Sequence, residues 1–313
     1  MISVIICTKD RPGFVEKCLE SLKSQTFKNF EIIVVDTGNK KTKNVCKKYG
    51  ARYIEEHRSG RCLARNVGIE NAKGEILFFF DDDTYLERDY IERMLENYKN
   101  DSVAGVGGVE IEDVELQKKK KQKRSLSNRL LGVFIYKLNP FMRNREIGII
   151  KSSGRVTDNF GRDKIIIERP IDVMHLKGFA MSFRKRVLER IGMFDVWYDK
   201  TAHREETDVC VRIIKTGNRL VFDPRSGVYH YLAADNPSHY QTMYNMYKQH
   251  QYFVFKNDLI HGIGWIEYFL GETIESFMVF VNIILFRDFR FLGLFKAKYD
   301  GIKEGIKKKW DLS

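Results

Sequence analysis

The stretch Ile76-Leu77-Phe78-Phe79-Phe80-Asp81-Asp82-Asp83 joins five apolar residues directly to three aspartates. A short apolar run is typical of a buried strand. Three carboxylates at the end of such a strand repel one another and resist desolvation, so packing alone does not favour them. A divalent cation would make the cluster favourable, because oxygen ligands suit Mg²⁺ and Mn²⁺. The junction therefore predicts a buried strand whose end is a candidate cation site, although the three acids taken alone favour a solvated turn.

The three acids are not equivalent as ligands. Side chains alternate in an extended segment, so Asp81 and Asp83 point one way and Asp82 the other. We therefore take the first and third acids as the candidate metal ligands. The alternative interpretation of the same residues is a solvated acidic turn.

Strand and helix patterns alternate over the first hundred residues. Strands are predicted at 3–7, 31–35, 51–55 and 75–80, and helices at 14–22, 41–49, 60–71 and 90–98. This order predicts an α/β fold with a doubly wound, mostly parallel sheet. Ligands of such sheets bind beyond the carboxyl ends of the strands. Thr8, Asp36 and Asp81 each follow a predicted strand, so we expect them to converge on one crevice.

The second half of the chain has weaker patterns. We expect a glycine-rich strand over 103–114, helices over 184–191 and 205–216, and a strand over 219–222 that ends in a turn at Asp223-Pro224. Residues 130–153 show no regular pattern.

We divide the chain into a catalytic domain over residues 1–235 and a C-terminal helical region over 236–313. Within the first we expect a donor half (1–112), a basic flexible segment (115–155) and an acceptor and catalytic-base half (171–235).

The C-terminal region contains a long apolar stretch, residues 262–286, with three glutamates. Its charge-free part, 276–286, is shorter than the ~20 residues that span a bilayer. Two interpretations remain open: the stretch packs on the globular domain, or it lies in a membrane interface.

The chain is basic, with a formal net charge of +12 over 313 residues. Residues 117–129, QKKKKQKRSLSNR, carry much of the local excess. Nucleic acid, anionic lipid and phosphorylated substrates all attract such a segment. The run contains no aromatic residue, which is untypical of a nucleic-acid-binding module, so we expect no nucleic-acid partner.

The five cysteines form no CxxC pair, and their number is odd, which favours free thiols in a reducing compartment. The first residues lack the pattern of a signal peptide. We therefore expect a cytoplasmic protein, with peripheral contact to the inner face of the membrane as an option.

Four segments in order resemble glycosyltransferase family 2, inverting enzymes of the GT-A fold, over roughly residues 1–232. They are SVIICTKDRPGFVEKCLESLKSQTF (3–27), EIIVVDTGN (31–39), GRCLARNVGIENAKGEILFFFDDDTYL (60–86), and the pieces from GFAMSFRKRVLERIGMFDVWY (178–198) to REETDVCVRIIKTGNRLVFDPRSGVYH (204–230). The resemblance implies inverting transfer of a sugar from a UDP-, GDP- or dTDP-sugar to a lipid-linked or glycan hydroxyl acceptor, assisted by Mn²⁺ or Mg²⁺.

The resemblance also implies roles for single residues. The implied donor-binding residues are Thr8, Asp36, Arg65, Asp81 and Asp82. The implied metal ligands are Asp83, Asp81 and His230. The implied general base is Glu206, with Glu205 second and Asp208 third. A positioned carboxylate can deprotonate an acceptor hydroxyl, and a cation stabilises the departing diphosphate.

Each of these residues also has a structural interpretation. Asp36 is suited to capping a turn, Arg65 to a solvated helix surface, and His230 to a satisfied structural position. The acids of the helix at 205–216 would favour its N-terminus without catalysis. At the level of function, the alternatives are a nucleotidyltransferase and a nucleic-acid-binding protein that uses the basic segment. The turn Thr8–Gly13 is a weak match for a triphosphate loop.

Overall fold

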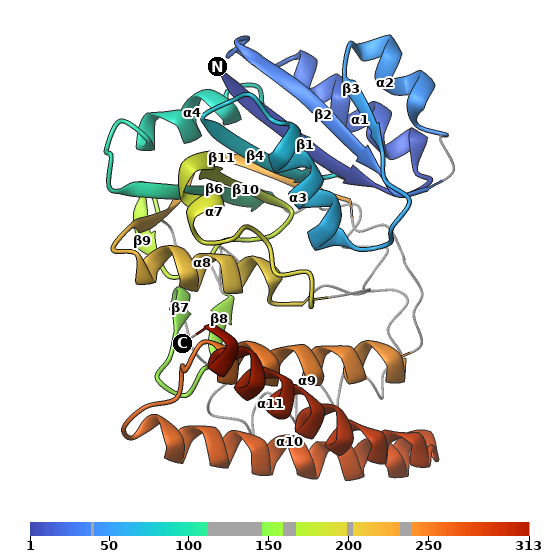
Figure 1. Cartoon of the computed structure of the whole chain (residues 1–313), viewed down its shortest axis with the longest axis vertical. Helices are drawn as coiled ribbons and strands as arrows, with labels where there is room; N and C mark the ends of the chain where they lie inside the picture. The colour runs from blue at the N-terminus through green and yellow to red at the C-terminus, as the bar shows by residue number, and fades with distance from the viewer. Residues whose placement is uncertain (39–40, 112–145, 159–166, 199–202, 232–238, 313) are drawn as a thin grey trace.

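The computed structural model describes residues 1–38, 41–111, 146–158, 167–198, 203–231 and 239–312 (Figure 1). The strands are β1 (Ile2–Thr8), β2 (Phe30–Asp36), β3 (Arg52–Glu55), β4 (Ile76–Asp81), β5 (Thr84–Leu86), β6 (Val103–Ile111), β7 (Ile147–Ile150), β8 (Val156–Asp158), β9 (Ile171–Val173), β10 (Ala180–Arg184) and β11 (Arg219–His230). The helices are α1 (Pro12–Lys23), α2 (Lys43–Tyr49), α3 (Arg61–Asn71), α4 (Tyr90–Asn97), α7 (Lys185–Arg190), α8 (Glu205–Lys215), α9 (His239–Lys256), α10 (Gly264–Phe286) and α11 (Gly293–Leu312), with a 3₁₀ turn η2 (Phe289–Leu292).

One large sheet has the strand order β3-β2-β1-β4-β10-β6-β11-β5, and β9 pairs with β11. The strands from β3 to β4 are all parallel, as expected for the first hundred residues. Beyond β4 the sheet is mixed, because β10 runs antiparallel to both of its neighbours. The α/β class predicted from the sequence is confirmed.

Helices cover both faces of this sheet, which explains the continuous apolar strands. Phe79 packs on the side of α3, α7 and α8, in a core that includes Cys62, Leu188 and Val209. Phe78 and Phe80 pack on the opposite side with α1, α2 and α4. The run 76–80 is therefore buried on both sides and fixes β4 in the middle of the sheet.

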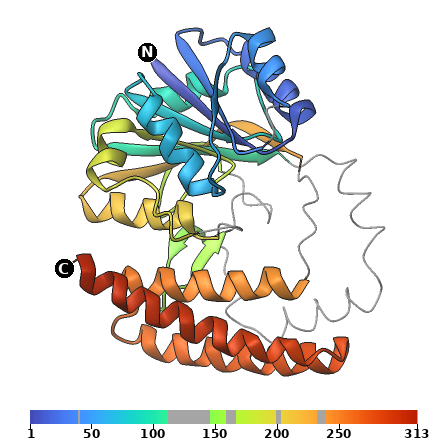
Figure 2. The same cartoon turned by 45° about the vertical axis from the view of Figure 1, so that its right-hand side comes forward.

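The C-terminal helices form a further layer below α8 (Figures 1 and 2). Tyr252, Phe253 and Val254 of α9 belong to the same core as Phe79. A smaller cluster that includes Val279 and Leu294 joins α10 and α11 to α9. Across the part of the chain that the structure describes, no helix has the length and apolar character to cross a membrane.

Two expectations from the sequence are wrong. The strand at 219–222 does not end at Asp223-Pro224: β11 continues to His230, and a bulge between Asp223 and Gly227 takes up the turn residues. Arg225 closes this bulge by donating hydrogen bonds to Asp223 from its backbone and its side chain.

The stretch 130–153 is likewise not wholly irregular, because β7 lies within it and pairs with β8. The basic run 117–129 lies outside the described residues.

Candidate active site

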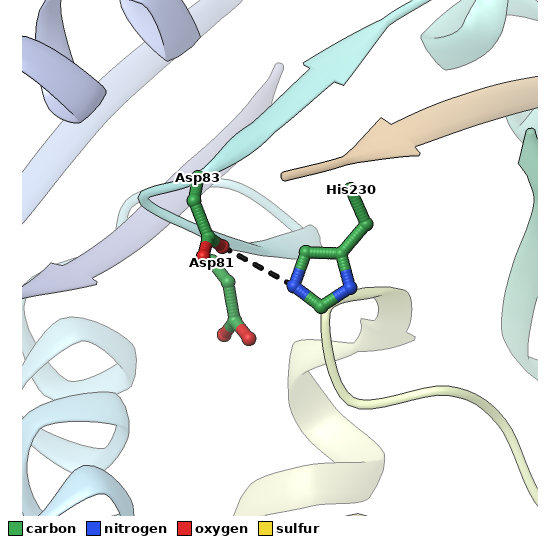
Figure 3. Close-up of side chains that lie close together, drawn as sticks. All are labelled: Asp81, Asp83 and His230. Carbon is green, nitrogen blue, oxygen red and sulfur yellow. Dashed lines mark ion pairs between the residues drawn. The ribbon is translucent and has the colours of Figure 1, made fainter. Parts of the chain in front are cut away.

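The acids after β4 separate into two groups. Asp81, Asp83 and His230 each offer a ligand atom, and these atoms all lie within 4.8 Å of one another (Figure 3). His230 reaches this position because the end of β11 pairs with β5, with His230 opposite Thr84. Its Nε2 lies 3.2 Å from an oxygen of Asp83. Residues far apart in the chain thus form one cluster.

Asp82 points to the other side and holds the turn after β1. The Thr8 hydroxyl donates a hydrogen bond of 2.6 Å to it, and Arg11 lies 3.3 Å away as an ion-pair partner. Desolvation raises the pKa of Asp82 to about 6, although the Thr8 hydrogen bond opposes this shift. Asp82 and Thr8 therefore fix the loop beside the cluster, and Asp82 lies outside the ligand set.

The cluster fits a divalent cation by its chemistry. Two carboxylates and one imidazole are a donor set that Mn²⁺ accepts, and Mg²⁺ also binds the carboxylates. Glu110 lies 3.7 Å from the other ring nitrogen of His230, and the Phe179 ring stacks on the imidazole at 4.6 Å. Such partners orient a metal-binding histidine.

The charge of the cluster is negative enough to hold a proton on its histidine. Burial would lower the pKa of His230, but hydrogen bonds to Asp83 and Glu110 outweigh it and raise the pKa to about 9.

Asp36 lies at the same edge of the sheet, opposite Thr8 in the β1–β2 register. Its side chain is fully buried and accepts hydrogen bonds from Thr42, from the backbone N–H of Gly38 at 2.8 Å and from Tyr53 at 3.3 Å. Asp36 therefore caps the turn after β2, as the structural interpretation of the sequence expected. The strand ends converge as expected, with the Asp36 carboxylate bound to its own loop.

Arg65 connects the two halves of the site. Its guanidinium donates a 3.1 Å hydrogen bond to Glu205, lies 3.5 Å from Asp81 and donates to the carbonyl of Gly178. The residue is 2% exposed, so the interpretation as a solvated surface cation is wrong. The Phe194 ring lies 5.2 Å from this guanidinium.

The paired acids at the start of α8 have pKa values that are shifted in opposite directions. Burial alone would raise the pKa of Glu205, but Arg65 and Arg61 outweigh it and hold the pKa below its usual value. Desolvation and the neighbouring Glu205 charge raise the pKa of Glu206 to about 8. The first acid is an ion-pair partner, whereas the second can exchange a proton near neutral pH.

Asp208 has different partners from this pair. It is fully buried and receives Arg212 at 2.9 Å, Lys256 at 2.9 Å and a hydrogen bond from Asn257. Burial opposes ionisation, but Arg212 and Lys256 hold the pKa of Asp208 below its usual value. Asp208 therefore connects α8 to α9.

Sequence reasoning missed four residues of the site: Arg11, Arg61, Glu110 and Phe179. The spacing of Arg61, one helical turn before Arg65, could have indicated a shared face of α3. Glu110 and Phe179 come from β6 and the segment before β10, and only the sheet order brings them to His230.

Comparison with known proteins gives the family. Residues 3–192 match the model of the family described as "Glycosyl transferase family 2". The chain is 34% identical over 113 residues to glycosyltransferase GlyA of Streptococcus pneumoniae. This match covers 33% of this chain and 16% of that protein. The chain is also 25% identical over 246 residues to glucosyl-dolichyl phosphate glucuronosyltransferase of Haloferax volcanii. This match covers 74% of this chain and 69% of that protein.

A third relative, glycosyltransferase AglE of Haloferax volcanii, is 34% identical over 116 residues. That match covers 34% of this chain and 38% of the relative, so the chain spans well under half of the length of some curated relatives it matches.

Solved structures agree on the fold. The mannosyltransferase PcManGT of Pyrobaculum calidifontis, solved with GDP-Man and Mn²⁺, aligns with a TM-score of 0.57 at 16% identity and covers 100% of this chain and 88% of that chain. GalNAc-T7, solved with UDP, GalNAc and Mn²⁺, aligns with a TM-score of 0.55 at 14% identity and covers 88% of this chain and 54% of that chain. The protein has the GT-A fold of these enzymes. The chain belongs to glycosyl transferase family 2.

Proposed function

We propose that this protein transfers a sugar from a nucleoside-diphosphate sugar to an acceptor hydroxyl with inversion at the anomeric carbon. The observation that carries the proposal is the geometry around Arg65. One buried guanidinium contacts Asp81 of the cation cluster and Glu205, the neighbour of a carboxyl group with a raised pKa. Arg65 would thereby hold the cation cluster, where the leaving group would bind, at a fixed distance from the start of α8, which carries the proposed base.

Glu206 is the general base in this proposal. Its pKa of about 8 lies near neutral pH, where a base combines availability with driving force. Inversion requires the acceptor hydroxyl to attack from the face opposite the diphosphate. Glu206 would accept the proton of that hydroxyl, while Arg65 fixes Glu205 and with it the first turn of α8. Asp208 has no part in proton transfer, because its oxygens already bind cations and an amide.

The donor side consists of Asp81, Asp83 and His230, which would hold Mn²⁺ or Mg²⁺. When bound there, the cation would neutralise the charge that gathers on the departing diphosphate. Thr8 and Asp36 lie opposite one another at the ends of β1 and β2, so we assign the nucleoside to this edge of the sheet. Arg65 adds a fixed positive charge next to Asp81.

The acceptor in this proposal is a lipid-linked or polysaccharide hydroxyl. The supporting observation is the relationship to the glucuronosyltransferase named for glucosyl-dolichyl phosphate, which extends over 74% of this chain.

A donor screen tests the proposal. We would measure thermal midpoints of the full chain with UDP-, GDP- and dTDP-sugars, each with Mn²⁺, Mg²⁺ or chelator, since ligands that bind the folded state raise the midpoint. We expect one nucleotide class to raise it, in a cation-dependent way. Asp83→Ala should lose this shift, whereas Asp101→Ala, which removes an exposed carboxylate, should keep it.

Product analysis tests the stereochemistry. The anomeric configuration of the product, measured by NMR, should be opposite to that of the donor. Retention, or a donor shift that survives both chelator and Asp83→Ala, would contradict the proposed chemistry.

A further inference from the structure

Helix α10 presents an apolar surface to solvent. Ile266, Phe269, Leu270, Phe277, Phe280 and Ile284 are between 50% and 75% exposed. Their spacing places them along one side of the helix, and Thr273 falls on the same line. We call these six apolar residues the α10 stripe. Both ribbon views show α10 as the outermost helix, on the side of α9 and α11 that faces away from the sheet (Figures 1 and 2).

The charged residues of α10 lie on its other side. Glu267 pairs with Arg155 at 3.0 Å, and Glu272 and Glu275 each pair with Lys298 at 2.8 Å. A surface helix in water normally has the reverse arrangement, with apolar residues inward and charges outward. The sequence of α10 therefore places its acids against the protein and its large apolar side chains outside.

Helix α11, which contacts α10 through the Phe280–Phe295 ring pair and the ion pairs of Lys298, exposes positive charge and aromatic rings. On α11, Lys296, Lys303 and Lys307 are exposed, as are Tyr299 and Trp310. Lysine with tyrosine and tryptophan beside an apolar surface is the composition of a membrane interface, where amines meet anionic headgroups and rings lie at the headgroup level. The basic net charge of the chain, +12, adds to the attraction.

We propose that the α10 stripe is a docking surface for an anionic lipid bilayer. The helix lies flat in the interface, with the stripe in the acyl boundary and the exposed lysines of α11 near the headgroups. An apolar protein partner would bury the stripe equally well, but it would not explain why exposed positions of α11 are lysines and the acids of α10 face inward. The inference is independent of the proposed transfer reaction.

Vesicle flotation with the full chain tests the proposal. The protein should float with vesicles of phosphatidylglycerol and phosphatidylcholine and bind vesicles of phosphatidylcholine alone at least about tenfold more weakly, with binding that falls as salt rises. The triple variant Phe269→Ser/Phe277→Ser/Phe280→Ser should lose flotation. The matched control Met246→Ser changes an apolar residue of α9 that is 44% exposed and should float like the natural protein.

Two further measurements separate lipid binding from misfolding. If the triple variant melts early, the single variant Ile284→Ser, at a position that is 75% exposed, should still weaken binding while keeping its thermal midpoint. Replacing Lys296, Lys303 and Lys307 by glutamine should remove the preference for anionic vesicles and the salt dependence.

Several results would overturn the proposal. One is flotation of the triple serine variant equal to that of the natural protein. Another is the absence of flotation with any vesicle. A third is a dimer, measured by light scattering without lipid, that the same variant dissociates, because a second copy would then cover the stripe. The donor-dependent thermal shift is measured separately, so a failure here leaves the proposed reaction standing.

Discussion

Two neighbouring carboxyl groups at the start of α8 respond differently to the same surroundings. Arg65 and Arg61 outweigh burial and lower the pKa of Glu205, whereas desolvation beside that charge raises the pKa of Glu206 to about 8. A pair of acids with pKa values shifted apart is the usual arrangement where one group binds and the other exchanges protons. This difference decides which acid we assign as the base.

Glu206→Gln should lower kcat by about 10²- to 10⁴-fold, because a general base typically contributes that factor. Donor binding should survive, since Glu206 lies outside the cation cluster. The measurement is steady-state kinetics together with the donor-dependent thermal shift. Glu189→Gln, which changes a half-exposed carboxylate on α7, is the control. If Glu205→Gln abolished turnover and Glu206→Gln did not, the assignment would pass to Glu205.

The Glu206→Gln substitution should also raise the free energy of unfolding at alkaline pH. At pH below about 4.5 the Glu206 carboxyl is protonated in both the folded and the unfolded state, so its ionisation does not change the free energy of unfolding. Between pH 4.5 and about 8 the unfolded chain releases the proton and the folded protein keeps it, so stability falls as pH rises. Glutamine does not ionise. The thermal midpoint of Glu206→Gln relative to the natural protein should therefore rise between pH 5 and 8.5, and a constant difference would argue against the raised pKa.

Arg65→Met should destabilise the fold by about 3–5 kcal/mol, because it leaves a buried Glu205 and the neighbouring Asp81 without their cation. Urea unfolding measures the change. Arg65→Lys keeps the charge but not the planar fork, so we expect an intermediate loss of stability. The double variant Arg65→Met/Glu205→Gln should recover part of the stability. Unfolding of Arg65→Met at the midpoint of the natural protein would show that the bridge is dispensable.

At the scale of elements, a buried polar network joins α8 to α9. Lys256 lies 2.7 Å from Asp195 and 2.9 Å from Asp208, and Tyr252 donates a hydrogen bond to Asp195. Buried charges of this kind are tolerated only where they are paired. The network fixes the first turns of α8, and Glu205 and Glu206 with them, against the C-terminal helices.

Asp208→Asn should therefore act on stability and not on chemistry. Loss of the charge leaves Arg212 and Lys256 partly unpaired, and we expect a cost of about 3–5 kcal/mol in urea unfolding. Turnover per folded molecule, measured at low temperature, should stay within a few-fold of the natural protein. A loss as large as that of Glu206→Gln at full stability would instead make Asp208 the base.

At the scale of the whole molecule, the boundary proposed at residue 235 crosses a single core. Tyr252, Phe253 and Val254 of α9 belong to the same cluster of buried residues as Ile5 of β1 and Phe79 of β4. The helices after residue 235 are thus in part a layer of the catalytic fold.

A fragment ending at residue 235 should consequently lose cooperative unfolding, because it exposes that core and leaves Asp195 and Asp208 without Lys256. Near-ultraviolet circular dichroism and urea titration would show the loss. A fragment ending at His261 keeps α9 and should retain more of the transition. Fully cooperative unfolding of the fragment 1–235 would instead support a domain boundary at residue 235.

The sequence by itself determined the strands of the first hundred residues and the position of the acids after β4. Apolar runs such as 76–80 are buried on both faces of the sheet, and acids that follow them have no place in the core, so local pattern sufficed. The family motifs also indicated Arg65 and the acids at 205–206 before any contact was known.

Only the tertiary structure decided which role each of those residues has. Arg65 is an ion-pair bridge because α3 and α8 pack on the same face, and His230 joins the aspartates because β11 pairs with β5. The same packing assigns Asp208 to the contact with α9 and turns the apolar side of α10 outward. A pKa or an exposed surface depends on neighbours from distant segments, which side-chain periodicity along one element does not encode.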